Sequence, residues 1–412
     1  MKYDDVPLWH RANLTPSKLY RYRAWRKANR QAIFRHYKPA DDRHILSDEI
    51  HLNAALNWLL VCQDQSSDQG FTGRYRLDQG WTTSYPETTG YIIPTLFALA
   101  EQATRRLLSI DVSVDELNER AVRAGEFLVS IQLPSGAFPA GEVRVNLDKP
   151  SPFNTAQIIN GLQSLHSHTG EEKFIDAAIK AANWLLEAQD NDGAWRQWFY
   201  HDIPASYCSH LACFVAELGC YLDNQDYLAS ARANANWVLD QQDLETGFFD
   251  KCGFTEEEQH LRIADLHTLA YNQAGLLRIA AALADENITA AAKRASDGVL
   301  DSLVRLGWLP GVLDHQWRAK ANSTCVTGCA QMALVWMEIN NTFPEAKYLS
   351  GARRAIDIVK RAQLIDVEDP GLAGAIPGSD PLWGWYNDGI MPNWAAKFFI
   401  DALIRMRFLD QS

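Results

Sequence analysis

The sequence lacks the long apolar run that a membrane-spanning helix needs. Nowhere in its 412 residues do about 18 apolar residues follow one another, the length at which a transmembrane helix is expected. The first residues, Met1-Lys2-Tyr3-Asp4-Asp5, include no apolar segment of the kind found in signal peptides. Cysteine is scarce, and its seven residues have no disulfide-like spacing. These absences predict a cytoplasmic protein without a transmembrane segment.

Common catalytic signatures are missing too. The chain contains no His-Glu-x-x-His metal motif, phosphate loop, dinucleotide fingerprint or serine nucleophile elbow. Cys325 and Cys329 stand four residues apart, a spacing that could place two metal ligands on one helix face. A stripe of small residues facing another helix explains this pair better. The sequence therefore predicts no cofactor and no metal.

Charge is distributed unevenly along the chain. The formal net charge of -12 argues against general nucleic-acid binding, yet every charged side chain from Arg11 to Lys38 is a cation, interleaved with aromatic rings. This segment has two interpretations. It is either a surface helix packed through its aromatics, or a patch that contacts a peripheral membrane surface or a polyanion such as an acidic glycan.

An internal repeat is the most informative pattern that is present. Four segments share a Trp or Phe followed by apolar residues and then by a Gln and a Gly-containing turn: Asn57–Leu60, Glu126–Val129, Asn183–Leu186 and Asn236–Leu239. Apolar residues recur every three or four positions, which indicates helices, and a two-residue alternation is nowhere sustained. A repeat of this length indicates stacked supersecondary units with one continuous core. We expect the Gly to end each outer helix.

The repeat predicts six helical hairpins. Outer helices are expected near residues 49–63, 114–132, 172–189, 226–242, 290–305 and 346–363. Inner helices, apolar on most faces, are expected near residues 87–107, 153–168, 205–222, 265–284, 325–340 and 391–407. Residues 1–45 form a basic, aromatic N-terminal arm with a helix near 16–37, and residues 46–412 form an all-α ring of the hairpins. At the end of the ring where the inner helices begin, we expect a concave cavity, the cup.

This pattern resembles the (α/α)6 toroid (six-hairpin barrel) proteins. They include six-hairpin glycosidases, polysaccharide lyases, catalytic domains of glucuronyl C5-epimerases and, more remotely, terpenoid cyclases and prenyltransferase β-subunits. The resemblance rests on the hairpin period and on the Gln-x3-Gly-x-(Phe/Trp) turns that begin at Gln132 and Gln189. The segments Tyr85–Tyr91 and Asn154–Leu162 are similar to bacterial proteins of surface-polysaccharide metabolism. The resemblance implies a carbohydrate-active protein with a glycan or oligosaccharide as its partner.

The segments that lead into the inner helices hold the candidate site residues, because ligand sites favour concave, partly apolar clefts with few polar groups. Residues that break the repeat are the better functional candidates. The predicted catalytic residues are Glu87, Tyr91, His201, Asp265 and His267. The predicted substrate-binding residues are Trp81, Tyr85, Arg196, Trp198, Tyr207, Tyr271, Trp317, Trp383, Trp385 and Tyr386.

Structural explanations compete for some of these residues. Ser84 or Thr83 is expected to cap the first inner helix, which places Glu87 in a first turn whose dipole favours a carboxylate. Asp265 could simply cap the fourth inner helix. His267 and Tyr271, four residues apart, share one helix face, where a histidine is often a satisfied core residue.

Several reactions fit these groups. A glycosidase needs two carboxylates across the scissile bond, and five acids lie near the expected cup: Glu87, Asp192, Asp265, Asp314 and Asp388. A uronic-acid lyase or C5-epimerase needs a Tyr or His base, an acid and a group that neutralises the carboxylate. Glycosidic bond cleavage is favoured, and the alternatives are lyase or epimerase chemistry, a terpenoid-cyclase-like enzyme without the usual Asp-rich motifs, and a non-catalytic glycan-binding toroid.

Overall fold

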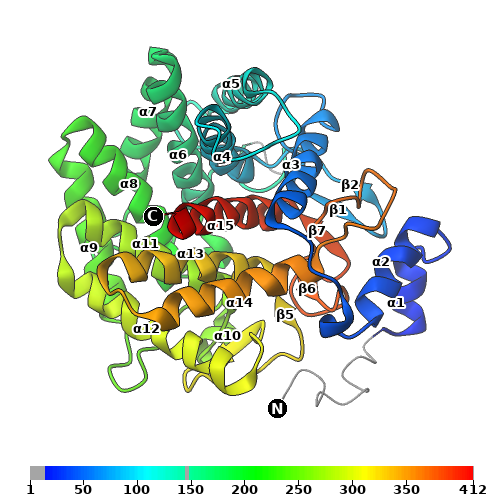
Figure 1. Ribbon diagram of the computed structural model, residues 1–412. Helices are drawn as coiled ribbons and strands as arrows, with labels where there is room; N and C mark the ends of the chain where they lie inside the picture. Colours follow the sequence, from blue (N-terminus) through cyan, green and yellow to red (C-terminus); the bar gives the residue numbers. More distant parts are fainter. Residues whose placement is uncertain (1–13, 144–147, 412) are drawn as a thin grey trace.

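The computed structural model describes residues 14–143 and 148–411, and helices dominate these residues (Figure 1). Outer and inner helices alternate along the chain, as the repeat predicts. The outer helices are α3 (Asp48–Asp64), α5 (Val114–Ile131), α7 (Glu172–Ala188), α9 (Gln225–Leu239), α12 (Glu286–Leu306) and α14 (Ala346–Ala362). The inner helices are α4 (Pro86–Thr104), α6 (Pro152–Thr169), α8 (Ser209–Leu222), α11 (Leu266–Leu283), α13 (Val326–Thr342) and α15 (Asn393–Gln411).

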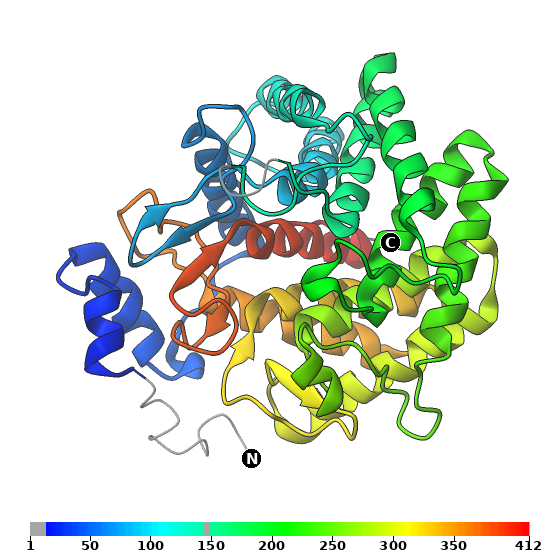
Figure 2. The ribbon, with the colours of Figure 1, turned by 180° about the vertical axis from the view of Figure 1, so that it is seen from behind.

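The inner helices pack side by side in chain order, and the last of them, α15, packs against both α4 and α3. The chain therefore closes into a ring, seen from opposite sides in Figures 1 and 2. Short antiparallel ribbons join the loops at one end of the ring. Their strands are β1 (Arg74–Arg76), β2 (Gly80–Trp81), β3 (Ile263–Asp265), β4 (Val312–Asp314), β5 (Thr324–Cys325), β6 (Ser379–Asp380) and β7 (Ile390–Pro392). Strands β1 and β7 pair and tie the first hairpin to the last.

Small residues let the inner helices approach one another closely. A Cβ on Gly161 of α6 would lie 2.2 Å from the backbone oxygen of Gly90 on α4, well inside van der Waals contact. A Cβ on Gly275 of α11 would likewise lie 2.3 Å from the backbone carbon of Ser209 on α8. Side chains at these positions would force the helices apart, so the small residues of the inner segments set the width of the ring.

The Gln of the repeat links neighbouring hairpins. The Gln132 side-chain amide donates to the Gly136 oxygen of its own turn and to the Ala177 oxygen of the next outer helix, at 2.8 and 2.9 Å. The same pair of hydrogen bonds, one to the turn and one to the next outer helix, is made by Gln63, Gln189, Gln242 and Gln363. Gln363 reaches the His51 oxygen of the first outer helix, so this contact also closes the ring. The repeated Gln is structural because it satisfies backbone carbonyls at each junction.

The prediction that a Gly ends each outer helix is confirmed for α12, which ends at Gly307 with a φ of 82°, and is wrong for α5 and α7. Gln132 and Gln189 are the residues at which α5 and α7 end, both in extended conformation. Gly136 and Gly193 come four residues later with φ values of 95° and 90°. A Cβ on either would lie 2.4 Å from a backbone oxygen of the next outer helix. The turn needs glycine both for its left-handed backbone and for this close approach.

The N-terminal arm contains two helices rather than one. Helix α1 (Pro16–Arg21) ends at Tyr22, and Arg23 adopts a φ of 49° before α2 (Lys27–Tyr37) begins. The left-handed residue turns the chain, so the single helix predicted near 16–37 is wrong. Arg11, the first cation of the basic segment, lies outside the described residues.

The cations of the arm dock it onto the ring. Ion pairs join Lys18 and Arg21 to Asp388, Lys27 to Glu368, Arg35 to Asp366 and Arg43 to Asp380. The predicted packing through aromatics holds only for Tyr22, which is buried. The exposed rings are Tyr20, Trp25, Phe34 and Tyr37. Contact of this exposed face with a membrane or polyanion stays a prediction.

Two features discussed for the sequence can be located in the structure. None of the described helices is long and apolar enough to cross a membrane. Cys325 and Cys329 are both buried, and the Cys325 Sγ accepts a hydrogen bond from the Gly328 backbone at the start of α13. No metal-ligating cluster of His, Cys, Asp or Glu occurs among the described residues.

Candidate active site

A cavity of about 730 Å³ opens where the inner helices begin, and we call it the cup. Its wall is formed by the loops that lead into these helices. Eleven of the fifteen predicted site residues line it: Tyr85, Glu87, Tyr91, Trp198, His201, Tyr207, Asp265, His267, Tyr271, Trp385 and Tyr386. The structure thus gathers side chains from four stretches that lie far apart in sequence, at residues 85–91, 198–207, 265–271 and 385–386.

Trp81 and Arg196 lie outside the cup. The Trp81 ring packs between Tyr75 and the repeat residue Trp58, with centroids 5.1 and 5.6 Å away. Arg196 is held on the outer side of its loop by ion pairs with Asp190 and Asp192, at 2.8 and 2.7 Å. Both residues stabilise the loops that carry the cup.

Trp317 and Trp383 also lie outside it. Trp317 fills the space over Gly298 of α12, and its indole nitrogen donates to the Thr246 oxygen at 2.8 Å. Trp383 is fully buried and lines a neighbouring cavity instead. A ligand in the cup reaches neither ring, which leaves both with a packing role at this site.

Glu87 stands at the start of α4, as the sequence predicts, although the cap differs from the prediction. Pro86 is the first helical residue and Tyr85 precedes it as the cap, without a side-chain capping bond. Ser84 turns away and donates to Asp68 at 2.5 Å. The Tyr85 side chain does not cap the helix and instead contacts Glu87.

Tyr85 and Glu87 are joined by a hydrogen bond. The Tyr85 hydroxyl donates to the Glu87 carboxylate at 2.7 Å. Burial raises the pKa of Glu87 to about 7, while this hydrogen bond and the charge of Arg74 act in the opposite direction. Glu87 is thus a buried carboxyl whose ionised form has a donor ready for it.

Asp265 is the last residue of β3 and directly precedes α11, yet its side chain makes no capping bond to that helix. The simple capping interpretation is therefore wrong. Only 2% of the residue is exposed, and its Oδ1 has no hydrogen-bond partner among the described residues. Burial, with a smaller contribution from Glu258, raises the pKa of Asp265 to about 8. Asp265 therefore presents to the cup a protonated carboxyl with one oxygen that has no hydrogen-bond partner among the described residues.

Asp265 and Glu87 approach the cup from opposite sides, because α4 and α11 are the first and fourth of six helices in the ring. Neither carboxyl contributes to the pKa shift of the other. Two carboxyls in separate environments with different pKa values are the usual arrangement for an acid and a base that share one substrate.

The other predicted acids are already neutralised. Asp192 pairs with Arg196, which lowers its pKa to about 2. Asp314 accepts from Arg318 at 2.9 Å and also pairs with a lysine. Asp388 is taken by the cations of the arm. The choice left open by the sequence narrows to Glu87 and Asp265.

His267 and Tyr271 face the floor of the cup, one turn apart on α11. The Nδ1 atom of His267 is 2.8 Å from the Gln331 side-chain oxygen, which favours a proton on Nδ1 and leaves Nε2 unprotonated. Burial lowers the pKa of His267 to about 4, so the ring is neutral near pH 7. A neutral imidazole of this kind can accept a proton.

The loop that carries His201 has a strained backbone. Trp198, His201 and Asp202 have φ values of 62°, 58° and 54°, unusual for residues other than glycine. His201 is exposed at the rim, with its ring 4.2 Å from that of Tyr200. Strain in a loop beside a cavity often accompanies function, and this position fits ligand contact better than buried acid–base work.

Several residues of the cup were not predicted from the sequence. Arg74 is the main one: it comes from β1 and its guanidinium lies 5.1 Å from the Trp394 ring while pairing with Glu142 at 3.1 Å. Phe153 and Phe254 add further rings. The three-residue strand β1 is held beside the cup by its pairing with β7. No pattern in the sequence near β1 predicts this long-range pairing.

Comparisons with solved structures agree on the architecture. An unsaturated glucuronyl hydrolase specific for heparin superposes with a TM-score of 0.68 at 12% identity, covering 89% of this chain and 98% of the other. The cellobiose 2-epimerase of Bacillus thermoamylovorans gives 0.67 at 12%, covering 87% and 96%. The glycosaminoglycan-degrading unsaturated glucuronyl hydrolase of Bacillus sp. GL1 gives 0.65 at 13%, covering 87% and 96%.

This chain has the (α/α)6 toroid fold. The prediction of fold class is confirmed, and these likenesses extend over nearly the whole toroid. A family model described as pectic acid lyase matches residues 152–216, which comprise α6, α7, the loop that carries Trp198 and His201, and the first part of α8. A comparison with curated proteins finds no significant match.

Proposed function

We propose that this toroid is a carbohydrate-active enzyme that cleaves a glycosidic bond, with Asp265 as general acid and Glu87 as the opposing carboxylate. The observation that carries the proposal is the pair of buried carboxyls with raised pKa values on opposite sides of one cup. A cavity that merely binds a glycan has no need to keep two acids without ionic partners, since such burial costs stability.

The two roles follow from the two environments. Asp265 has the higher pKa and an oxygen without a partner, so it holds a proton to give. Glu87 accepts the hydrogen bond of Tyr85 and feels Arg74, so its carboxylate form is better stabilised. Between pH 7 and 8 the protein can hold both at once in the required states, and the rate is expected to peak there.

The reaction balances with these groups. Asp265 transfers its proton to the glycosidic oxygen as the bond from that oxygen to C1 breaks. Glu87 takes a proton from a water molecule whose oxygen bonds to C1, or bonds to C1 itself before water displaces it. Rings on the cup wall, among them Tyr207 and Trp394, offer flat surfaces for the sugar.

The architecture supports this proposal, because hydrolases of unsaturated glucuronyl groups share the fold. Sequence identities of 12 and 13% transfer no substrate from those proteins to this one. The proposal therefore rests on the two carboxyls of this chain.

A second reaction class is favoured by His267. Its neutral ring, oriented by Gln331, could remove a proton from a carbon next to a carbonyl or carboxylate, as epimerases and lyases require. The cellobiose 2-epimerase shares the same fold. In this case His267 would be the base, and Arg74 would neutralise negative charge on the substrate.

Product analysis separates the two classes. The protein is incubated with a panel of neutral and acidic oligosaccharides in deuterated water. A hydrolase yields products that together gain one water, and the anomeric form of the first product tells whether Glu87 attacks water or C1. A lyase yields an unsaturated, ultraviolet-absorbing sugar, and an epimerase introduces deuterium on carbon without a change in chain length. Hydrolysis that persists unchanged in Asp265→Asn and Glu87→Gln would overturn the assignment.

A further inference from the structure

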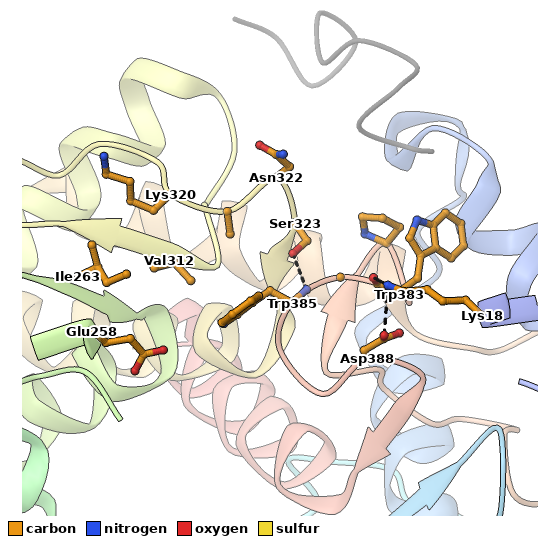
Figure 3. A pocket seen from close by; sticks show the side chains of 13 residues that line it. Lys18, Glu258, Ile263, Val312, Lys320, Asn322, Ser323, Trp383, Trp385 and Asp388 are labelled. Carbon is orange, nitrogen blue, oxygen red and sulfur yellow. Dashed lines mark hydrogen bonds and ion pairs between the residues drawn. The ribbon is translucent and has the colours of Figure 1, made fainter. Parts of the chain in front are cut away.

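A second cavity of about 390 Å³ lies beside the cup. Its walls come from the arm, from the segment around Ser323 and from the loop between β6 and β7. Trp385 and Glu258 line both cavities, so the two adjoin each other. Figure 3 shows Lys320 and Lys18 on opposite sides of this outer cavity, with Trp385 between them.

Trp385 has a fixed backbone and a free ring. Its backbone nitrogen donates to the Ser323 hydroxyl at 3.1 Å. A Cβ on the preceding Gly384 would lie 2.5 Å from the Ser323 Cβ, so the loop lies flush against that residue. The side chain itself is 68% exposed. An ordered loop that presents a bare indole between two cavities is suited to stack against a flat ligand face.

The outer cavity carries an excess of positive charge on both sides of Trp385. Asp388 is shared by Lys18 and Arg21, at 3.1 and 2.6 Å. Asp314 is shared in the same way by Arg318 and Lys320, at 2.9 and 3.3 Å. Each corner therefore holds two cations for one carboxylate.

Glu258, an acid at the rim, reduces this excess without removing it. Glu258 accepts hydrogen bonds from the backbone nitrogens of Phe254 and Thr255, at 2.7 and 3.1 Å, in the capping box of α10 (Glu256–His260). Its carboxylate is held by its own helix but keeps its negative charge. The cavity is lined by Lys18, Lys320, Asp388 and Glu258. With the ion-pair partners Arg21, Arg318 and Asp314, four cations face three carboxylates. This excess of one positive charge favours an anionic group.

We propose that the outer cavity is a sugar-binding subsite for an acidic residue of the glycan chain. This inference rests on the proposed function and deepens it. The chain would pass from the cup over the Trp385 indole into the outer cavity, where its carboxylate or sulfate lies near Lys320 and Lys18. The arm supplies Lys18, so it helps to select the substrate as well as docking on the ring.

The test measures binding, so it does not depend on turnover. Asp265→Asn protein, unchanged elsewhere, is titrated calorimetrically with oligogalacturonates, sulfated chondroitin oligosaccharides and uncharged cello-oligosaccharides of two to six sugars. Affinity is expected to rise with chain length more steeply for the acidic series than for the uncharged one. Comparing the carboxylated with the sulfated series identifies the anion.

Two variants locate the effect. Lys320→Gln is expected to weaken binding of long acidic chains about three- to tenfold and to lower its salt dependence, because exposed charges contribute modestly. Trp385→Ala is expected to weaken long chains of both kinds about tenfold. Lys180→Gln removes an exposed lysine on α7, far from both cavities, and serves as the matched control.

The inference fails if Lys320→Gln and Lys180→Gln bind the acidic chains equally well. It also fails if affinity stops rising once a disaccharide fills the cup, or if no oligosaccharide of the panel binds. Length-dependent acidic binding that needs Lys320, found in a protein that cleaves no glycan, would uphold the subsite and overturn the hydrolase proposal separately.

Discussion

The two ends of the toroid differ in whether their charged side chains form ion pairs. A cavity of about 830 Å³ lies between the C-terminal halves of the inner helices, and it is larger than the cup at about 730 Å³. In it Arg278 pairs with Glu217 at 2.6 Å, and Lys397 pairs with Asp401 at the same distance. The larger cavity neutralises its own charges, which is what a structural cavity does.

The cup does the opposite. Its acids Glu87 and Asp265 form no ion pair within the described part of the chain, and burial raises the pKa of each. The Tyr271 ring, stacked on His210 with centroids 4.2 Å apart, stands between the two ends. The difference teaches that unneutralised groups, rather than volume, mark the candidate site in this ring.

The largest expected effect is on turnover. Asp265→Asn and Glu87→Gln each lower kcat by about 10²- to 10⁴-fold, because each variant removes an acid–base group at nearly constant size. Steady-state kinetics on any oligosaccharide found to be cleaved measures this loss.

The opposite end provides the matched control. Glu217→Gln makes the same chemical change in the larger cavity, where it should leave kcat within about twofold. Equal losses for the Glu217 and Glu87 variants would erase the distinction between the two ends.

The next effect is on stability. Arg278→Met leaves Glu217 without its partner and lowers the free energy of unfolding by about 1 kcal/mol, because both side chains of the pair are about one third exposed. Urea denaturation measures the change, while the activity of the remaining folded protein stays constant. Adding Glu217→Gln to the same chain should recover part of the loss. A loss of kcat without loss of stability would move the functional site to that end.

The last effect is on the pH dependence of stability. The pKa of Asp265 is raised to about 8 in the folded protein, from about 4 for an ordinary Asp carboxyl. Between these values the unfolded chain has lost a proton that the folded protein keeps, so stability falls as pH rises through this window. Asp265→Asn abolishes this contribution and should stabilise the protein at pH 8 by more than about 1 kcal/mol.

Unfolding curves at pH 4 and pH 8 test this prediction. The variant should gain little at pH 4, where the carboxyl is protonated in the folded protein and already about half protonated in the unfolded chain. Asp192→Asn is the control, because pairing with Arg196 lowers the pKa of that acid to about 2 and its loss should not stabilise. A gain that is equal at both pH values would contradict the raised pKa of Asp265.

The ring was predictable because its cause is periodic. Apolar spacing of three and four and a recurring Gln determine where helices lie, and every helix of the six hairpins appears close to its expected range. The loops were predictable only as a group. Glu87 and Asp265 follow from their position at helix starts, while Arg74 depends on the long-range pairing of β1 with β7.

Misassigned aromatics have a similar cause. Trp81 and Trp385 both lie in loops rich in rings, and the sequence gives them equal claims on a ligand. The structure packs Trp81, which is partly buried, against Trp58, and leaves the Trp385 ring exposed. Which ring is covered depends on packing between loops of different hairpins, and no local periodicity encodes that packing.

The ring can close only after the last hairpin has been synthesised. Helix α15 must reach α3 and α4, and Gln363 must find a backbone oxygen 312 residues away in sequence. Contacts of such separation form slowly. While a ribosome is still completing the last hairpin, the apolar flanks of the first remain uncovered and prone to aggregate. We therefore expect the incomplete chain to depend on protection from aggregation until the last hairpin closes the ring.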